Sequence, residues 1–199
     1  MIKLHTVTPT DYFGSNCYIV ESLNECIVID PSVPYEKIRE IIGDISIKCI
    51  LLTHAHFDHI YSINTYKNIP VYVGAGDAKM LSDPYLNCYL GFLGIHDGYF
   101  SDYTALNDGD ELSFGEEKIK VIATPGHTPG GMSYQIGSAV FVGDTLFENG
   151  GYGRCDLPLG DIEVLEKSLI KLFARFRDET FYPGHGNQST FKETIEYFN

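Results

Sequence analysis

The sequence predicts a mixed α/β fold in one domain over residues 1–199, and three observations support this. Apolar runs of strand length alternate with segments whose apolar residues recur at helical spacing. The chain has 199 residues and is 44% hydrophobic, which is enough for one well-packed core and too short for two large ones. No internal repeat, low-complexity tract or linker divides it.

The first predicted strands include a hairpin. Residues 2–7 alternate in polarity, and two β-rich runs, 16–20 and 26–30, flank the polar connection 21–25. The continuous apolar run 47–53 is typical of a strand buried on both faces. Further strands are predicted over residues 71–73, 119–123, 131–136, 139–142 and 180–182.

Helices are predicted between these strands. Pro34 suits the first turn of a helix and Gly43 suits its end. Asp161 is predicted to cap a long helix whose apolar residues keep the helical period. Shorter helices are expected over 60–67 and 76–81, and a last helix closes the chain.

Charge and composition argue against several classes of partner. The net charge is −13, with 14 Lys and Arg against 27 Asp and Glu, so we expect neither a nucleic-acid nor an anionic-membrane partner. No run approaches the ~20 apolar residues of a membrane span, and the first residues show no signal-peptide pattern. Five scattered cysteines, never in a C-x-x-C pair, indicate reduced structural thiols. We expect a cytoplasmic protein that acts on a small molecule.

Metal-ligand residues are concentrated in residues 53–59, T-H-A-H-F-D-H, directly after an apolar run. Imidazole and carboxylate are the ligands that ions such as Zn²⁺ prefer. Because neighbouring side chains point in different directions, one ion cannot use all four. His54 and His56 suit one ion, and Asp58 and His59 suit a second. The alternative interpretation is a solvated polar loop.

Three further ligand-type residues each follow a predicted strand and a sharp turn. His127 and His185 follow Pro-Gly turns, and Asp144 follows a glycine. Each alone is compatible with an ordinary surface residue, but strand ends gathered at one edge of a sheet are where α/β proteins build sites. We assign the ligands as His54, His56 and His127 for one ion, and Asp58, His59 and His185 for another, with Asp144 as the bridge. His5 and His96 lack this setting and are interpreted as structural.

Four motifs therefore occur in the order T-H-A-H-F-D-H, P-G-H-T-P-G, G-D-T-L-F and Y-P-G-H-G, over nearly the whole chain. In this order they resemble the metallo-β-lactamase-fold hydrolases. G-D-T-L-F followed by G-R-C-D at 153–156 is most similar to small glyoxalase II-like (hydroxyacylglutathione hydrolase-type) proteins. The resemblance implies a four-layer αββα sandwich with the metals at one edge of two packed sheets, and the same ligands. The cofactors expected are two divalent transition-metal ions, zinc foremost, with iron or manganese as alternatives.

Two departures from the longer glyoxalase II enzymes weaken the glutathione-specific interpretation. Those enzymes carry a helical C-terminal region that helps hold glutathione, whereas here only residues 186–199 follow His185. Gly186 also stands where their last motif often has glutamate. The two departures do not weaken the prediction that the protein is a hydrolase.

The expected function is hydrolysis of thioesters such as hydroxyacylglutathione, by a metal-bridging hydroxide. Metal binding brings the pKa of water to about 7, and Asp58 is the expected catalytic residue that orients the hydroxide. Arg154 is expected to bind a substrate carboxylate, with an ordinary surface arginine as the alternative. Tyr182 is expected to donate a hydrogen bond at the pocket wall, or else to pack as a buried tyrosine.

Other functions remain open on the same residues. A persulfide dioxygenase would hold one iron through His54, His127 and Asp144, and a lactonase uses a similar histidine loop. An exported β-lactamase is disfavoured by the missing signal peptide, and a non-catalytic metal-binding module by the complete ligand set. The irregular segment 82–103 contains six aromatic residues among three glycines and is expected to form the substrate entrance, or alternatively a dimer interface.

Overall fold

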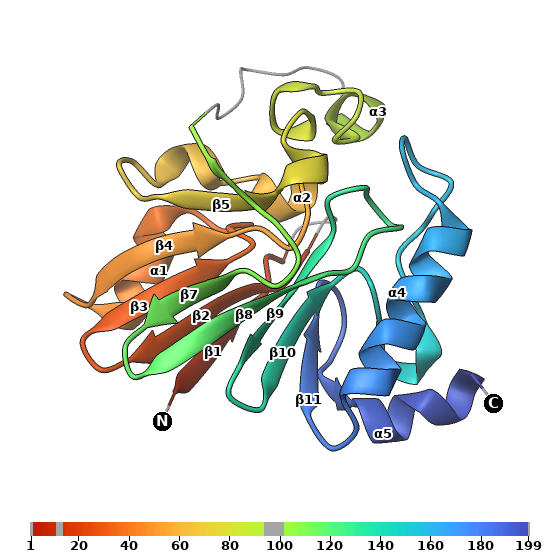
Figure 1. Cartoon of the computed structure of the whole chain (residues 1–199). Coiled ribbons are helices and arrows are strands. Elements are labelled where there is room, and N and C mark those ends of the chain that lie inside the picture. The colour runs from red at the N-terminus through yellow and green to blue at the C-terminus, as the bar shows by residue number, and fades with distance from the viewer. Residues whose placement is uncertain (1, 11–13, 94–101, 199) are drawn as a thin grey trace.

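The computed structural model describes residues 2–10, 14–93 and 102–198, and in it two β-sheets pack face to face with helices on their outer faces (Figure 1). The first sheet has the order β1 (Lys3–Val7), β2 (Cys17–Ser22), β3 (Glu25–Ile29), β4 (Ser46–Leu51), β5 (Val71–Gly74) and β6 (Thr104–Leu106). The second sheet has the order β12 (Ser189–Thr190), β11 (Thr180–Pro183), β10 (Ala139–Gly143), β9 (Met132–Ile136), β8 (Glu117–Ala123) and β7 (Glu111–Phe114). The predicted αββα sandwich is confirmed.

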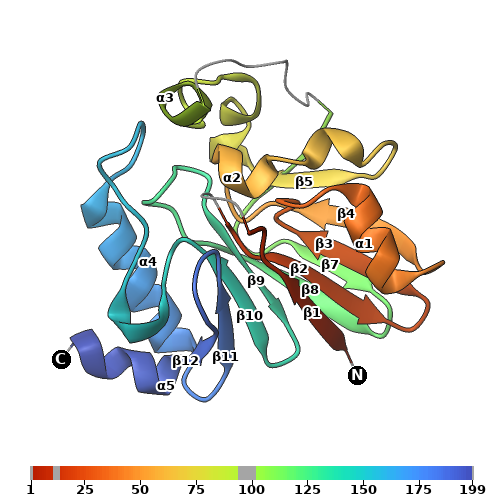
Figure 2. The same ribbon diagram turned by 180° about the vertical axis from the view of Figure 1, so that it is seen from behind.

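The helices cover both outer faces of the sandwich, as the view from behind in Figure 2 also shows. They are α1 (Tyr35–Ile42), α2 (Phe57–Ile60), α3 (Tyr89–Leu93), α4 (Ile162–Arg175) and α5 (Phe191–Thr194). Short 3₁₀ turns are η1 (Ile63–Thr65), η2 (Ala75–Asp77), η3 (Met80–Ser82), η4 (Glu148–Gly150) and η5 (Ile195–Phe198). None of the described helices combines the length and the apolar character needed to cross a bilayer.

The alternation of side chains along each strand divides the apolar residues among three clusters. In β2, Tyr18 packs between the two sheets, whereas Cys17 packs on the side of α1. In β10, Phe141 packs between the sheets, whereas Val140 packs against α4. Both faces of each sheet are therefore used for packing, so a site open to solvent is expected in the loops at the sheet edges.

Strand direction decides which loops meet. β3, β4, β5 and β6 are mutually parallel, and β10 runs parallel to β11. The ends of parallel strands lie at the same edge of a sheet, so the segments after β3 and β4 are neighbours, as are those after β10 and β11. The register pairs Gly143 with Pro183, which places the residues that follow, Asp144 and Gly184-His185, side by side.

Several predicted elements are confirmed, and the long helix is one of them. Asp161 caps α4, because its carboxylate accepts hydrogen bonds from the backbone N–H groups of Glu163 and Val164. Helix α1 ends at Gly43, which has a positive φ of 60°. All five cysteines are free, and four of them are buried, which agrees with their structural interpretation.

The predicted helix over 60–67 is wrong. The helical turn begins earlier, at Phe57, and ends at Ile60. The following backbone is tied to the loop after β3, since the N–H of Ser62 donates to the carbonyl of Pro31 and the hydroxyl of Ser62 donates to that of Ser32. These contacts compete with helix continuation.

The predicted helix over 76–81 is also wrong, and it is replaced by the turns η2 and η3. Gly74 and Gly76 lie so close to the backbone of Pro129 and Gly130 that a Cβ at either position would collide with it. The chain here follows a contact with a distant loop rather than its own helical preference. Strands β6 and β7 were not predicted, because they are only three and four residues long, too short for a clear alternation of polar and apolar residues.

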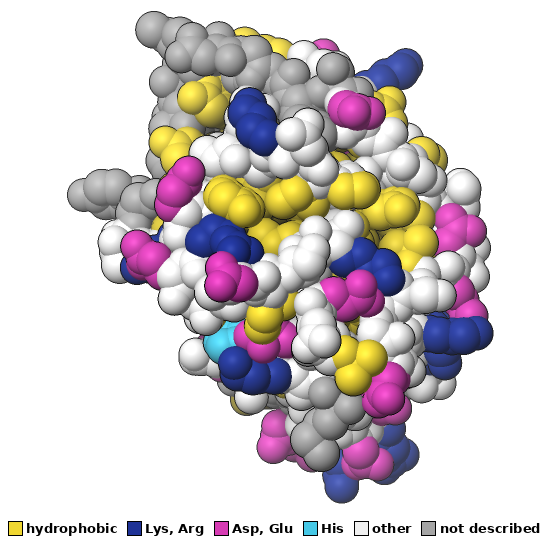
Figure 3. Space-filling view, turned by 90° about the vertical axis from the view of Figure 1, so that its left-hand side faces the viewer, with side chains coloured by type: hydrophobic (Ala, Val, Ile, Leu, Met, Phe, Trp, Pro, Cys, Tyr) yellow, Lys and Arg dark blue, Asp and Glu magenta, His cyan; other side chains and the backbone are white. Residues whose placement is uncertain are grey.

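The molecular surface carries charges of both signs. Figure 3 shows one face, on which acidic and basic side chains are interspersed around a band of exposed hydrophobic side chains. This face presents no continuous basic stripe of the kind that binds a phosphate backbone.

Candidate metal centre

The loops that carry the predicted ligands meet at one edge of the sandwich. Residues 53–59 follow β4 of the first sheet, whereas His127, Asp144 and His185 follow β8, β10 and β11 of the second. The site therefore lies across the junction of the two sheets. All seven predicted ligands are described residues, and the structure brings them together.

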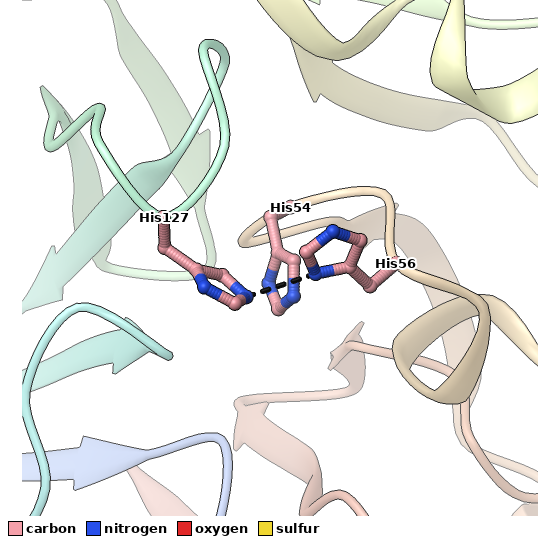
Figure 4. A group of neighbouring side chains, drawn as sticks. All are labelled: His54, His56 and His127. Atoms are coloured by element: carbon pink, nitrogen blue, oxygen red, sulfur yellow. Dashed lines mark hydrogen bonds between the residues drawn. The ribbon is translucent and has the colours of Figure 1, made fainter. Parts of the chain in front are cut away.

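The first group comprises His54, His56 and His127, whose rings face one another in Figure 4. Their ligand atoms all lie within 4.8 Å of one another. The Nδ1 atom of His56 is 2.8 Å from Nε2 of His127. All three side chains are buried, so water competes little for their nitrogen lone pairs.

The second group comprises Asp58, His59 and His185, whose ligand atoms also lie within 4.8 Å of one another. The Nε2 atom of His185 lies 3.1 Å from Oδ2 of Asp58, and Nε2 of His59 lies 3.7 Å from the same oxygen. His185 is the most exposed of the three, with 37% of its side chain accessible. The second group therefore lies nearer to solvent than the first.

Asp144 lies between the two groups. Its Oδ2 atom is 3.5 Å from Nε2 of His127 and 3.6 Å from Nε2 of His185. Its Oδ1 atom is 3.4 Å from Nε2 of His59. This position fits a bridging carboxylate, as the sequence predicted. Gly184 permits it, because a Cβ there would collide with Oδ1 of Asp144.

The chemistry of these residues fits metal ions. Among the described residues, the buried side-chain atoms without a hydrogen-bond partner are Nε2 of His54, His56 and His59 and Oδ1 of Asp144. An unsatisfied buried polar atom costs about 1–3 kcal/mol. Their concentration at one point is therefore expensive unless another group satisfies them. Nitrogen and carboxylate donors in this arrangement suit divalent transition metals.

Burial sets the protonation of the first group. It lowers the pKa of His54 well below the usual value, that of His56 to about 3, and that of His127 as well. These rings are consequently neutral at pH 7 and offer lone pairs. For His59 burial acts in the same direction, but the carboxylates of Asp58, Asp144 and Asp30 outweigh it and raise the pKa.

Asp30 is the functional residue that the sequence analysis missed. Its Oδ2 atom accepts a hydrogen bond from Nδ1 of His59 at 2.8 Å, which directs Nε2 of that ring toward the centre. Oδ1 of Asp30 accepts from the backbone N–H of Thr53 at 2.7 Å, and Oδ2 also accepts from the Thr53 hydroxyl at 2.6 Å. The sequence contained a signal, because Asp30 follows strand β3 as Asp144 follows β10.

A cavity of about 590 Å³ opens beside these residues. His56, Asp58, His127, Asp144 and His185 contribute to its wall. The remaining wall is mainly apolar or aromatic, with Phe57, Cys88, Phe147, Tyr152 and Leu157 among its residues. This volume and lining are typical of a small-molecule site.

Arg154 lies at the cavity, as predicted for a substrate contact, but its guanidinium is engaged within the chain. Nε and Nη2 donate to the two carboxylate oxygens of Asp156 at 2.8 and 2.7 Å. Both side chains are largely exposed, at 62% and 70%. Its backbone carbonyl accepts a hydrogen bond from Nδ1 of His127 at 2.7 Å, so Nε2 of His127 is left for a metal.

Tyr182 does not line this cavity. Its ring stacks on Phe141 at 5.1 Å and contacts Tyr18 edge-on at 5.7 Å between the sheets. The predicted contact with substrate is thus replaced by the packing role that was its alternative. His5, interpreted as structural, lies 2.6 Å from Glu21, whereas His96 lies outside the described residues.

The segment 82–103 is described only in part, since residues 94–101 lie outside the described ranges. Its beginning lies next to the centre. Cys88 lines the cavity, and the ring of Tyr89 contacts that of Phe57 at 6.0 Å. The entrance and dimer interpretations both remain predictions.

Comparison with known proteins places this centre in a family. Residues 10–185 match the family model of the metallo-beta-lactamase superfamily. The chain belongs to this superfamily. "Probable metallo-hydrolase YqgX" of Bacillus subtilis is 34% identical over 190 residues, covering 91% of this chain and 89% of YqgX. The B. subtilis protein "Probable polyketide biosynthesis zinc-dependent hydrolase PksB" is 29% identical, covering 92% and 78%.

Two solved structures superpose over nearly the whole chain. The BLEG-1 B3 metallo-beta-lactamase has a TM-score of 0.85 and 29% identity, covering 98% of this chain and 97% of that chain. TTHA1623, solved in a di-iron-bound form, has a TM-score of 0.84 and 30% identity, covering 97% and 98%. Because one similar protein is named zinc-dependent and another holds iron, the superfamily assignment does not fix the metal.

We predict that chelation will destabilise the purified protein, because buried nitrogen and oxygen atoms then lose their partner. An ion present at 100 times its Kd stabilises a fold by about 2.7 kcal/mol. Thermal unfolding with and without EDTA should show a lower Tm with the chelator and recovery on adding Zn²⁺. His54→Ala disables the first ligand group and should show a smaller change in Tm with EDTA, whereas the control His5→Ala should keep the full change. An unchanged wild-type Tm would contradict metal binding here.

Proposed function

We propose that this chain is a metal-dependent hydrolase that cleaves thioesters or esters, with hydroxyacylglutathione-type thioesters as the first substrates to test. The proposal rests on one observation, the convergence of two three-residue ligand groups and a bridging aspartate on one wall of the 590 Å³ cavity. The hydrolase names of the curated relatives support the reaction class. The G-D-T-L-F and G-R-C-D motifs support the glyoxalase II-like subtype.

Two divalent ions held by these groups would supply hydroxide at neutral pH, polarise the substrate carbonyl and stabilise the leaving thiolate or alkoxide. The chain's own task is to orient the reactants. Burial alone would raise the pKa of Asp58, but the rings of His59 and His185 outweigh it and lower that pKa. Asp58 is therefore ionised at pH 7, and its carboxylate accepts a hydrogen bond from the attacking water and fixes its direction.

The cavity wall suits an acyl group more than a highly charged substrate. Phe57, Phe147 and Leu157 offer apolar surface that excludes water from the reacting carbonyl. Among the described residues that line this cavity, Arg154 is the one Lys or Arg. A substrate carboxylate would compete with Asp156 for it, and the exposed pair is weakened by solvent screening, so exchange of partners is inexpensive.

A single-iron persulfide dioxygenase remains the alternative on the same fold. An ion held by His54, His127 and Asp144 alone would leave the buried Nε2 atom of His59 without a partner. A second ion held by Asp58, His59 and His185 would satisfy that atom, which supports the dinuclear hydrolase. A lactonase would use the same groups on a cyclic ester.

The proposed function is tested by metal analysis together with a thioester assay. Metal-replete protein should contain close to two transition-metal ions per chain and should hydrolyse S-lactoylglutathione. One iron per chain, with oxygen consumed on adding glutathione persulfide, would favour the dioxygenase instead.

Asp58→Asn should lower kcat by at least ~100-fold, the usual scale for a positioned catalytic group, and change KM much less. The amide keeps the size of the side chain but cannot accept through both of its polar atoms. Metal content must be measured on the same sample. Asp44→Asn, at a fully exposed carboxylate, is the matched control and should leave both constants unchanged. Wild-type turnover in a fully loaded Asp58→Asn protein would remove Asp58 from the mechanism.

Arg154→Ala should reduce kcat/KM for S-lactoylglutathione much more than for an uncharged thioester, because only the former loses a carboxylate contact.

Asp156→Asn tests the same arginine from the side of its ion-pair partner. It removes the competing carboxylate and should lower KM for the charged substrate alone. Equal losses on both substrates in Arg154→Ala would mean that the arginine only supports its loop.

A further inference from the structure

Two separate hydrogen-bond clamps hold the ligand loops, and the first is centred on Asp77 in turn η2. The carboxylate of Asp77 is fully buried. Its Oδ2 atom accepts from the backbone N–H of Ala55 at 3.0 Å and from the hydroxyl of Thr128 at 2.8 Å, and Oδ1 accepts from the N–H of Gly130 at 2.5 Å. Ala55 stands between His54 and His56, and Thr128 follows His127. Asp77 thus joins the two loops that form the first ligand group.

Asp77 is held in a buried position by hydrogen bonds from two separate loops. Among the described residues, the groups that donate hydrogen bonds to Asp77 are uncharged N–H and O–H groups, and none of them belongs to a basic side chain. Burial raises its pKa to about 6, which reflects the cost of placing a charge there. The position is also tightly fixed, because a Cβ at Gly130 would collide with the backbone nitrogen of Asp77. Such a group is suited to setting a distance between two loops.

The second clamp is centred on Asn16 at the start of β2. Its backbone N–H donates to the carbonyl of Gly184 at 2.7 Å. Its side-chain Nδ2 donates to the carbonyls of Pro183 at 3.1 Å and Gly186 at 3.0 Å. These bonds hold the chain on both sides of His185.

The neighbours of Asn16 extend the second clamp. The hydroxyl of Tyr18 donates to the carbonyl of Pro183 at 2.6 Å, and the hydroxyl of Ser15 donates to the carbonyl of Asp58 at 2.8 Å. The start of β2 therefore holds two members of the second ligand group. Among the described residues, Asp77 and Asn16 share no hydrogen-bond partner.

We propose that Asp77 and Asn16 are positioning residues, each of which sets the metal affinity of one ion. Asp77 serves the ion held by His54, His56 and His127, and Asn16 serves the ion held by Asp58, His59 and His185. The inference rests on the ligand assignment of the proposed function. It adds that the two affinities are controlled by different, separable contacts.

Single-site proteins allow the two ions to be titrated one at a time. His185→Ala disables the second group and leaves the first, whereas His127→Ala does the reverse. Into each protein we introduce Asp77→Asn or Asn16→Ala. Metal-free protein is then titrated with Zn²⁺ against a chromophoric chelator of known affinity. Thermal unfolding of the metal-free form is recorded for every variant.

Asp77→Asn should weaken Zn²⁺ binding ~10- to 100-fold in the His185→Ala protein, the range for losing a group that orients a ligand. It should change binding less than about 3-fold in the His127→Ala protein. Asn16→Ala should give the reverse pattern. The control Tyr66→Phe removes a buried hydrogen bond to the carbonyl of Val33, outside both clamps. It should lower Tm without altering either Zn²⁺ affinity.

If Asp77→Asn or Asn16→Ala does not fold, milder variants test the same proposal. Thr128→Val removes one bond of the first clamp. Tyr18→Phe removes the bond to the Pro183 carbonyl and the bond accepted from Nδ2 of Asn16 in the second clamp. Each should weaken only its own site, by a few fold. If the clamp variants lower Tm but leave both affinities unchanged, or weaken both sites equally, the proposal is wrong. If the wild-type protein takes up fewer than two Zn²⁺ ions, the ligand assignment itself fails and the inference fails with it.

Discussion

The hydrogen bonds between Asp30 and Thr53 join the strand ends, the second sheet and a ligand histidine around the candidate metal centre. Asp30 ends β3 and Thr53 begins the histidine loop after β4, so their two bonds join the ends of two parallel strands. The carbonyl of Thr53 accepts from the N–H of Met132 at 2.7 Å, which ties the same point to the second sheet. Asp30 also orients His59. A single buried carboxylate thereby links the packing of the sandwich to the direction of a ligand.

The pKa values of the neighbouring rings of His54 and His59 are shifted in opposite directions, and the groups around each ring explain the difference. His54 lies among other histidines and is kept neutral by burial, whereas His59 lies among three carboxylates that favour its charged form. The two ring centroids are only 4.0 Å apart. Metal binding requires the neutral form of each ring. Binding of an ion by the second group would therefore favour release of a proton from His59, whereas binding by the first group would not require one.

Sequence reasoning found the seven ligand-type residues because each carries a local signal, a strand and a turn followed by imidazole or carboxylate. Asp30 carries the same signal, but it was counted as the last residue of a strand. Asp77 carries none, since its partners are 22 to 53 residues distant in sequence and its importance exists only after folding. Tyr182 was misplaced because it lies close to His185 in sequence while its strand directs the ring between the sheets. The helices expected over 60–67 and 76–81 failed for a related reason, as contacts with remote loops overrode local preference.

The distribution of the ligands over both sheets has a consequence for the order of folding. One half of the centre is encoded by residues 54–59 and the other by residues spread between 127 and 185, so every ligand group needs chain segments that are remote in sequence. Closing such long loops costs entropy before any ligand bond forms, and structures rich in distant contacts fold slowly for that reason. Neither sheet alone can hold an ion with a complete ligand group. An ion bound by these groups would therefore bind only after the two sheets have docked, and it would cross-link them.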